Sequence, residues 1–384
     1  MVLDLALMRV STHIRLAAIV RPLATTVVDK RCVLSGAKDL VKCDGRIAFN
    51  AGTIIQFVKR GDMTTALVTG ITGFVGSRLA ERLLNDGYDV FGLIRPCASR
   101  DLKVIEPLLP EITLLVGDLT SVFSLSNVLR TASPDIVFHL AALSPVRYSF
   151  ERPFEYQEIN YMGTLNLVHS LMELSDYKKR RLVAASTAEV YGMQANMPFK
   201  EELGLKPSSP YAVSKAAMDM YLRMAMGVFD LNCVILRPTN SYGRKYEKGF
   251  IMEYLITSML SGERVYLGAP ESIRDYLYVE DHVGAYILAA ERENARGQVF
   301  NVGSGMGISN KDLALRISEI LDFDVKKIEL GSYPPRYPLR PLVSDQPYLV
   351  LDSTKISREL GWAPKVGLEE GIRMVADYWK AASK

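Results

Sequence analysis

The chain has 384 residues, 48% of them hydrophobic and 23% charged, and its formal net charge is +3. These values are typical of a globular protein large enough to fold as two unequal lobes, and they exclude a disordered chain. Residues 1–62 contain ten Lys and Arg against five Asp and no Glu, so the remainder is slightly acidic, which excludes a nucleic-acid-binding protein by charge.

Residues 1–62 form an N-terminal extension with two open interpretations. The longest apolar run, residues 5–28, is interrupted by three arginines and is therefore not expected to span a membrane. An arginine-bearing segment without Glu is typical of an organellar transit peptide. Alternatively, the native chain begins at Met63, directly before the first strand-like run. We favour this second interpretation because the fold that follows needs no feature of the extension.

The four cysteines lack CxxC spacing and neighbouring histidines, so we expect no metal site. Their pattern predicts reduced thiols and therefore a cytoplasmic protein. A disulfide bridge between Cys32 and Cys43 is the alternative.

From Met63 onward, short β-branched or apolar runs alternate with helical patterns. This alternation is typical of an α/β fold in which helices cover both faces of a parallel sheet, so we predict a Rossmann-type doubly wound sheet over residues 63–240. The first helix is predicted over 74–85, with Gly87 as its left-handed stop. The six predicted strands are residues 66–69, 90–94, 112–116, 136–140, 182–185 and 233–236.

After Arg237 the alternation weakens, and helices are predicted over 250–260, 281–293 and 309–321. Residues 241–384 are therefore expected to form mainly a smaller α/β lobe that binds the substrate. Residues 331–347 are rich in Pro and Tyr, which disfavours a helix or a central strand and predicts a surface loop over the site.

The turn after the first predicted strand carries three glycines at a three-residue spacing. Glycines let backbone N–H groups and the positive end of the following helix approach a pyrophosphate closely. Because a strand precedes the motif and a helix follows it, the pattern favours dinucleotide binding over a merely tight turn. The cofactor-binding residues predicted here are Gly70, Thr72, Gly73, Phe74, Val75 and Gly76.

The second predicted strand ends in Arg95, with no Asp or Glu for the adenosine ribose. An arginine at this place can bind a 2′-phosphate, so NADP is favoured over NAD, and an ordinary solvated arginine is the alternative. Asp118, after the third strand, is expected either at the adenine edge or as a helix cap.

Tyr211 and Lys215 follow the fifth predicted strand and lie four residues apart, on one face of a helix. In this arrangement the ammonium group can lower the pKa of the phenol and position the cofactor ribose. The tyrosine can then exchange a proton with a sugar hydroxyl while a hydride moves to or from nicotinamide. A surface pair without function is the alternative, but the position downstream of the glycine motif favours catalysis.

With these motifs in place, the chain from Met63 to about Tyr378 resembles the extended short-chain dehydrogenase/reductases, specifically the nucleotide-sugar epimerases and dehydratases. The resemblance implies a nicotinamide cofactor, a nucleotide-sugar substrate, and a homodimer or homotetramer paired through helices like 156–174 and 211–228. Besides the glycine motif and the Tyr/Lys pair, it rests on residues 139–144, 160–164, 236–243, 274–281 and 301–303.

The resemblance also assigns roles to single residues. Tyr211 is implied to act as the base at the sugar 4-hydroxyl, and Ser186 or Thr187 to bond the same oxygen. Asn240, Arg274 and Arg340 are implied to hold the diphosphate, although each arginine could instead belong to a surface ion pair. Further implied contacts are Leu119, Leu140, Ala141 and Ala142 with the cofactor and Ser144 with the substrate.

Glu189 separates the subfamilies in this resemblance. Dehydratases carry Ser-Thr-x-Glu-x-Tyr-Gly, here residues 186–192, whereas epimerases usually carry a small residue in place of the Glu. Glu189 is therefore expected to remove the C5 proton of a 4-keto sugar, which makes a 4,6-dehydratase the leading function. A structural carboxylate is the alternative for the residue. A 4-epimerase, a 4-keto-sugar reductase or a protein that keeps only the nucleotide fold is the alternative for the chain.

The resemblance favours GDP-mannose as the substrate. The thymidine-diphosphate-glucose dehydratases have Asp where this chain has Ala188, whereas the GDP-mannose 4,6-dehydratases lack that Asp and carry Arg after the second strand. They also share the pattern of residues 142–151 and the Arg-Pro at 340–341. Two departures leave the substrate open: residues 73–76 read as in epimerases and reductases, and UDP-glucuronate decarboxylases share the Glu motif.

Overall fold

The computed structural model describes residues 41–43, 46–48, 63–96, 102–195, 197–334, 341 and 344–382. Within residues 1–62 it describes only strand β1 (Val41–Cys43) and its antiparallel partner β2 (Arg46–Ala48). The interpretations of the N-terminal extension and of a Cys32–Cys43 bridge therefore fall outside the described residues.

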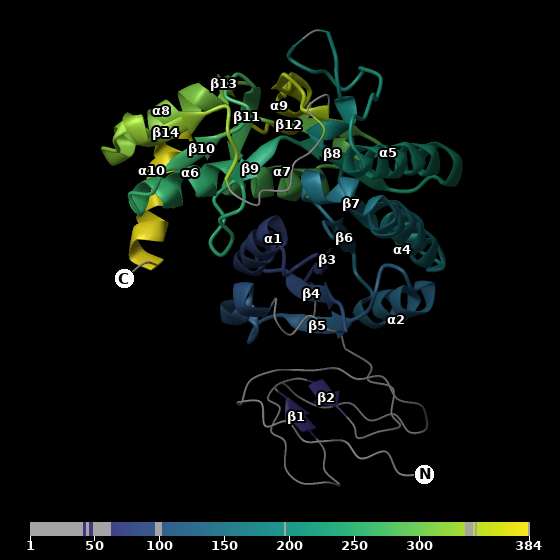
Figure 1. Cartoon of the computed structure of the whole chain (residues 1–384). Coiled ribbons are helices and arrows are strands. Elements are labelled where there is room, and N and C mark those ends of the chain that lie inside the picture. Colours follow the sequence, from purple (N-terminus) through teal and green to yellow (C-terminus); the bar gives the residue numbers. More distant parts are fainter. Residues whose placement is uncertain are drawn as a thin grey trace.

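A seven-stranded parallel sheet organises the first lobe, in the order β12-β8-β7-β6-β3-β4-β5 (Figure 1). The strand order reverses between β3 and β6, which confirms the predicted doubly wound fold. All six predicted strands are present within two residues at each end, and β12 is an unpredicted seventh. The strands are β3 (Thr65–Thr69), β4 (Asp89–Ile94), β5 (Thr113–Val116), β6 (Ile136–His139), β7 (Arg181–Ala185), β8 (Cys233–Pro238) and β12 (Val299–Val302).

Successive residues of the central strand β3 pack into different cores, as the two-residue period of a strand requires. Ala66 and Val68 join one hydrophobic core, whereas Leu67 between them joins the other. Figure 1 shows α2, α4 and α5 on one side of the sheet and α1 and α7 on the other. The helices are α1 (Phe74–Asn85), α2 (Val122–Ala132), α4 (Gly163–Met172), α5 (Pro210–Phe229) and α7 (Val279–Glu291).

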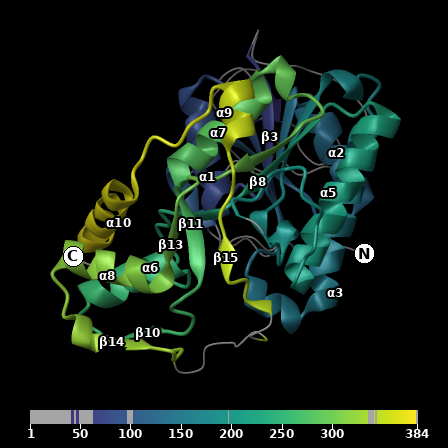
Figure 2. The same cartoon turned by 90° about the horizontal axis from the view of Figure 1, so that it is seen from above.

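The second lobe consists mainly of residues after 240. Strand β11 lies between β13 and β15 and also pairs with β9, while β10 pairs with β14. Seen from above, helices α6, α8 and α10 gather away from α2 and α5 (Figure 2). The elements are β9 (Asn240–Tyr242), α6 (Ile251–Leu260), β10 (Val265–Leu267), β11 (Ile273–Tyr278), β13 (Gly307–Ser309), α8 (Asn310–Leu321), β14 (Ile328–Leu330), β15 (Tyr348–Leu349), α9 (Thr354–Leu360) and α10 (Leu368–Ala382).

Shorter helical segments connect these elements. Helix α3 (Pro153–Tyr156) continues through a π-helical stretch, Gln157–Met162, into α4. A 3₁₀ turn, Ala188–Tyr191, follows β7 and carries Glu189. Among the described residues, no helix is both long and apolar enough to cross a membrane. The other 3₁₀ segments are Leu102–Val104, Glu106–Leu108, Val146–Phe150, Tyr177–Lys179, Glu293–Ala295 and Val325–Lys327.

The predicted surface loop over 331–347 is only partly described. Residues 335–340 and 342–343 lie outside the described part, so the predicted diphosphate contact at Arg340 has no structural account. The described part resumes at Ser344 and leads into β15, which pairs with β11. The end of this segment therefore belongs to the sheet of the second lobe.

Candidate active site

The glycine turn after β3 is built so closely that it needs glycine. Gly70 has a φ of +73°, and a Cβ there would lie 2.8 Å from the backbone nitrogen of Ala141. A Cβ on Gly76 would overlap the carbonyl oxygen of Gly70. Helix α1 begins at Phe74, and its N-cap residue, Gly73, has no side chain to cap the first N–H groups. This cradle and its free helix N-terminus fit the pyrophosphate of a dinucleotide.

The predicted adenosine-binding residues lie at the ends of neighbouring strands. Ile94 of β4 pairs with Val116 of β5, so Arg95 and Asp118 follow adjacent strand ends. Asp118 Oδ1 accepts from the backbone nitrogen and the hydroxyl of Thr120, both at 2.8 Å. Ser121, not Asp118, caps α2, so the helix-cap interpretation of Asp118 is wrong. The predicted Leu119 is buried.

A buried histidine connects the glycine turn to its neighbours. His139, at the end of β6, has its Nδ1 2.8 Å from the Thr69 hydroxyl and its Nε2 2.9 Å from the Thr164 hydroxyl. Burial, together with the charge of Lys215, lowers the pKa of His139 to about 3, so the imidazole is neutral near pH 7. The backbone nitrogen of Ala141 also donates to Thr69 Oγ1, which places the predicted residues 140–142 beside the glycine turn.

Thr187 and Glu189 both lie close to Tyr211. Thr187 forms a side-chain hydrogen bond with Tyr211, and the negative charge of Glu189 acts on the phenol. Burial raises the pKa of Tyr211, Thr187 opposes this increase, and Glu189 adds to it. The Glu189 carboxylate is thus near enough for its charge to act on the Tyr211 phenol, and the catalytic roles of the two residues stay a prediction.

Lys215 departs from the expected geometry. Its Nζ donates to the carbonyl oxygen of Ala185 at the end of β7. Burial lowers the pKa of Lys215 to about 8, while Asp219 raises it. The expected lowering of the tyrosine pKa by Lys215 is not found, because burial of Tyr211 dominates and the lysine charge is not among its causes. Lys215 remains on the helix face of Tyr211, one turn further along α5.

Ser186, predicted to contact the substrate, is engaged elsewhere in this structure. Its hydroxyl donates to the buried carboxylate of Asp219 at 2.8 Å, and the residue is 3% exposed. Asp219 also receives two bonds from the buried Arg237, at 2.8 and 2.9 Å. A buried carboxylate needs such a partner, because an uncompensated charge inside a protein is costly. The sequence offered Ser186 and Thr187 as equal candidates, and only Thr187 reaches Tyr211.

The predicted substrate residues have unequal positions. Ser144 is exposed in the loop after β6, beyond the predicted cofactor residues. The amide of Asn240 donates to the Asp275 carbonyl oxygen at 3.3 Å. Arg274 is paired with Asp345 at 2.7 Å, so a diphosphate would have to share or displace that carboxylate. Arg274 thus forms an ion pair, as the alternative expected, but the pair is largely buried and not on the surface.

Two residues that the sequence analysis did not select contribute to the site. Asn160 accepts from the backbone nitrogen of Leu143 at 2.8 Å and donates to Ser214 on α5 at 3.0 Å, so it fastens the loop after β6. Gln346 donates to Glu189 Oε2 at 3.0 Å. Asn160 had a sequence signal within the motif at 160–164, whereas nothing local distinguished Gln346.

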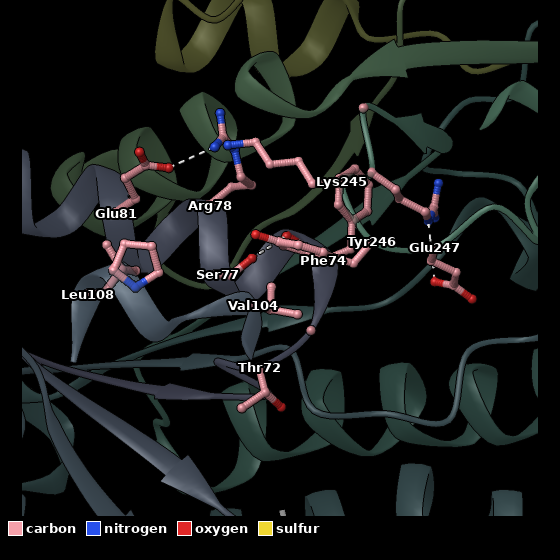
Figure 3. Close-up of a pocket in the computed structure, with 14 residues that line it drawn as sticks. Thr72, Phe74, Ser77, Arg78, Glu81, Val104, Leu108, Lys245, Tyr246 and Glu247 are labelled. Atoms are coloured by element: carbon pink, nitrogen blue, oxygen red, sulfur yellow. Dashed lines mark hydrogen bonds and ion pairs between the residues drawn. The ribbon is translucent and has the colours of Figure 1, made fainter. Parts of the chain in front are cut away.

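A cavity of about 240 Å³ lies on the outer side of the glycine turn (Figure 3). It separates the first turns of α1 from residues 243–247 of the second lobe, and Thr72 lines it. The Arg244 guanidinium lies 4.3 Å from the Phe74 ring centroid and 3.6 Å from that of Phe250, so it packs the second lobe against α1. The predicted cofactor-binding residues Thr72, Gly73 and Phe74 line this cavity, whereas Tyr211 and Glu189 do not.

The chain combines a doubly wound sheet, this glycine turn, and a Tyr/Lys pair on the helix that follows the Ser-Thr turn. Together these features define a nicotinamide-dependent short-chain dehydrogenase/reductase. The family described as GDP-mannose 4,6 dehydratase matches residues 67–375. The chain accordingly belongs to the extended short-chain dehydrogenase/reductase family of nucleotide-sugar epimerases and dehydratases.

Similar proteins cover more than one reaction. A UDP-glucose 4-epimerase of Mycolicibacterium smegmatis is 31% identical over 83% of this chain and 99% of its own length. A GDP-mannose 4,6-dehydratase of Sordaria araneosa is 32% identical over 79% of this chain and 59% of its own. The structure of a dTDP-glucose 4,6-dehydratase from Streptomyces venezuelae, which holds NAD, has a TM-score of 0.74 at 26% identity, covering 82% of this chain and 97% of the other. A nicotinamide cofactor and a nucleotide-sugar reaction follow for this family.

Proposed function

We propose that this chain is a nucleotide-sugar 4,6-dehydratase that forms a 4-keto-6-deoxy sugar, with GDP-mannose as the favoured substrate. The observation that carries the proposal is the position of Glu189 on the turn after β7, from which its negative charge raises the pKa of the Tyr211 phenol. A 4-epimerase needs a proton acceptor only at O4, whereas a dehydratase needs one at O4 and a second one at C5. Thr187, Glu189, Tyr211 and Lys215 are the proposed catalytic residues.

The proposed residues act in sequence on the sugar. A bound nicotinamide would supply the hydride chemistry, namely removal of a hydride from C4 and its return at C6. Tyr211 takes the proton of the 4-hydroxyl, and Thr187 bonds the same oxygen. Glu189 then removes the C5 proton, and the C5–C6 double bond forms as the C6–O bond breaks. The departing oxygen takes the proton from Glu189 and leaves as water, and C5 takes up a proton from solvent when the hydride is returned at C6. Lys215 orients the cofactor ribose from one turn further along α5.

GDP-mannose is favoured by features of this sequence. Ala188 is buried where the thymidine-diphosphate-glucose enzymes carry the acid for C6, so Glu189 must handle both the C5 proton and the leaving oxygen. The chain resembles the GDP-mannose dehydratases in three features: the lack of Asp at position 188, the pattern of residues 142–151, and the Arg-Pro at 340–341. Arg274 and Asn240, on the paired strands β11 and β9, are proposed to hold the diphosphate together with Arg340.

The cofactor is proposed to be NADP, on the basis of Arg95. Arg95 is exposed at the end of β4, the strand beside the glycine-bearing β3, where the adenosine ribose of a dinucleotide lies. The contacts proposed for the cofactor further include the glycine turn, Asp118, Leu119 and residues 140–142. NAD is the alternative, since related structures hold it.

A 4-epimerase is the second candidate, because residues 73–76 read as they do in epimerases and the Mycolicibacterium enzyme matches almost its whole length. The two reactions give different products. An epimerase returns an isomer of unchanged mass, whereas a dehydratase returns a sugar lighter by one water.

Product analysis by mass spectrometry tests the proposal. The enzyme is incubated with GDP-mannose, UDP-glucose and dTDP-glucose in turn, and the retained cofactor is identified in the same samples. The expected result is loss of water from GDP-mannose. Glu189→Gln should reduce dehydration by about a hundredfold or more, the usual contribution of a general base. The matched control is Glu201→Gln, whose carboxylate accepts from the Asn301 backbone nitrogen away from Tyr211. Unchanged product formation by Glu189→Gln would contradict the assignment.

A further inference from the structure

Glu189 receives a hydrogen bond from a residue far along the chain. Nε2 of Gln346 donates to Oε2 of Glu189 at 3.0 Å, across 157 residues of sequence. Glu189 lies on the 3₁₀ turn after β7, whereas Gln346 lies just before β15 in the second lobe. Gln346 is 2% exposed, so water does not compete for its amide.

The segment that carries Gln346 is held firmly on both sides. Asp345, its predecessor, pairs with Arg274 at 2.7 Å. The hydroxyl of Tyr348, two residues further on, donates to the carbonyl oxygen of Gln194 at 2.7 Å. Leu349 then pairs with Arg274 in the register of β15 and β11. The amide of Gln346 is therefore presented to Glu189 from a fixed backbone.

The second amide atom of Gln346 has no partner. Its Oε1 is buried and accepts no hydrogen bond from any of the residues that the structure describes. A buried acceptor left unpaired costs about 1–3 kcal/mol, so proteins seldom keep one without a use. An amide is both a donor and an acceptor, and a half-turn about its last side-chain bond exchanges the two.

We propose that Gln346 is a positioning residue that serves Glu189 in both of its protonation states. Its Nε2 donates to the carboxylate before the proton is taken, and its Oε1 accepts from the carboxylic acid afterwards. The inference rests on the proposed function, in which Glu189 takes the C5 proton. It adds Gln346, a residue of the second lobe, to the residues proposed to take part in proton transfer.

The proposed reaction takes Glu189 through both states. Its carboxylate removes the proton from C5, and the electrons of the C5–H bond form the C5–C6 double bond as the C6–O bond breaks. The departing oxygen takes the proton from Glu189 and leaves as water, which restores the carboxylate. A cation in place of Gln346 would stabilise only the carboxylate, and a second carboxylate only the acid. A neutral amide stabilises both.

Other ionisable groups surround this pair. Tyr211 faces Glu189 from α5, with Lys215 one turn beyond it. Asp345 adjoins Gln346 in the chain and is neutralised by Arg274 from β11. The control variant below leaves all four of these residues in place, so a change seen only at Gln346 is not due to them.

The experiment compares Gln346→Met, which keeps the length but loses both hydrogen-bonding atoms, with Gln346→Glu, which keeps the shape. We expect Gln346→Met to lower kcat for dehydration about tenfold with KM little changed, the effect of one hydrogen bond to a charged group. The acid limb of the pH–rate profile should move up by about one pH unit, because the lost hydrogen bond to the charged carboxylate is stronger than the lost neutral bond to the carboxylic acid. Gln346→Glu should move it further in the same direction.

Two readouts separate this role from simple packing. In a single turnover, the absorbance of the reduced nicotinamide should appear at the rate of the unchanged enzyme, since the C4 step does not use Glu189. Tyr348→Phe is the matched control: it removes a bond that fixes the same segment but leaves the amide of Gln346 intact. Its acid limb should not move.

The outcomes are distinct. An unmoved acid limb in Gln346→Met, or an equal shift in Tyr348→Phe, overturns the role of Gln346 while leaving the function standing. Dehydration that survives in Glu189→Gln overturns the function and this inference together. If Gln346→Met does not fold, Gln346→Leu, which also lacks both hydrogen-bonding atoms and adds no charge, is measured in its place.

Discussion

Adjacent hydroxyl residues at the end of β7 serve different purposes. Successive side chains leave an extended backbone on opposite sides, so Ser186 and Thr187 cannot both face the cleft. Ser186 turns inward to Asp219, where it satisfies a carboxylate with no exposure to solvent, and Thr187 turns to Tyr211. The side that each residue faces follows from the strand register, which the sequence motif does not contain.

His139 makes the stability of the fold depend on pH. Its pKa falls from the ordinary value of 6.5 to about 3 when folded, because it is buried near Lys215. Between these two pH values His139 is therefore protonated in the unfolded chain but not in the folded chain. The stability is fully present above pH 6.5 and is lost as the pH falls towards 3.

His139→Gln should remove the contribution of this residue to the pH dependence of stability. Between pH 6 and pH 4.5, His139 should lower the wild-type free energy of unfolding by about 1.4 kcal/mol for each unit that the pH falls. The variant should lack this contribution to the slope. Urea denaturation at several pH values measures it. His169→Gln, at an exposed position on α4, is the control and should keep the wild-type slope. Equal slopes in all three proteins would show that His139 is not the titrating group.

At the scale of elements, the glycine turn joins three parts of the sheet lobe. Gly70 meets the backbone after β6, and Gly76 lets the first turn of α1 fold back onto Gly70. The helix axis is thereby aimed at the site that a pyrophosphate would occupy. A side chain at Gly76 would meet backbone, which cannot move aside as a flexible side chain can.

Two glycine-to-alanine variants test this geometry. Gly76→Ala should cost about 1–3 kcal/mol of stability and weaken binding of the reduced dinucleotide, because the turn must open. Gly227→Ala is the counterpart: it lies within α5 with no atom near the added Cβ, and should gain about 0.5–1 kcal/mol. Cofactor fluorescence and urea denaturation provide the readouts. Tight cofactor binding by Gly76→Ala would refute the close-approach argument.

Strand β12 shows what element-level analysis of the sequence misses. It joins the edge of the Rossmann sheet beside β8, although it follows β11 and α7 along the chain. Asn301 within it is buried and donates to the carbonyl oxygen of Phe199. A four-residue run carries no period that identifies its sheet, so its partner is decided by tertiary packing.

At the scale of the whole molecule, apolar side chains are exposed along one face of α5. Met220, Met224 and Val228 repeat every four residues and are 58%, 40% and 68% exposed. Phe154 on α3, which packs against α5, is 87% exposed. A contiguous apolar face of this kind is typical of a subunit interface, and it lies on the helices through which the sequence analysis expected pairing.

We therefore predict a homodimer through α5. Met220→Asp should shift the protein to monomers, because a dimer axis places the new charge close to its copy. Light scattering coupled to size-exclusion chromatography gives the mass. Met306→Asp, at a position 63% exposed beside β13, is the control and should not change it. A monomeric wild-type protein would exclude the interface.

By itself, the sequence determined the six strands, the glycine turn, the helix that carries Tyr211 and Lys215, and the family. Each depends on a short-range signal: the period of a strand or helix, or a turn that only glycine permits. The tertiary structure decided that Thr187 and not Ser186 meets Tyr211, that Arg274 pairs with Asp345, and that Gln346 reaches Glu189. These pairings join residues tens to hundreds of positions apart, and no local pattern encodes which side chains meet when lobes pack together.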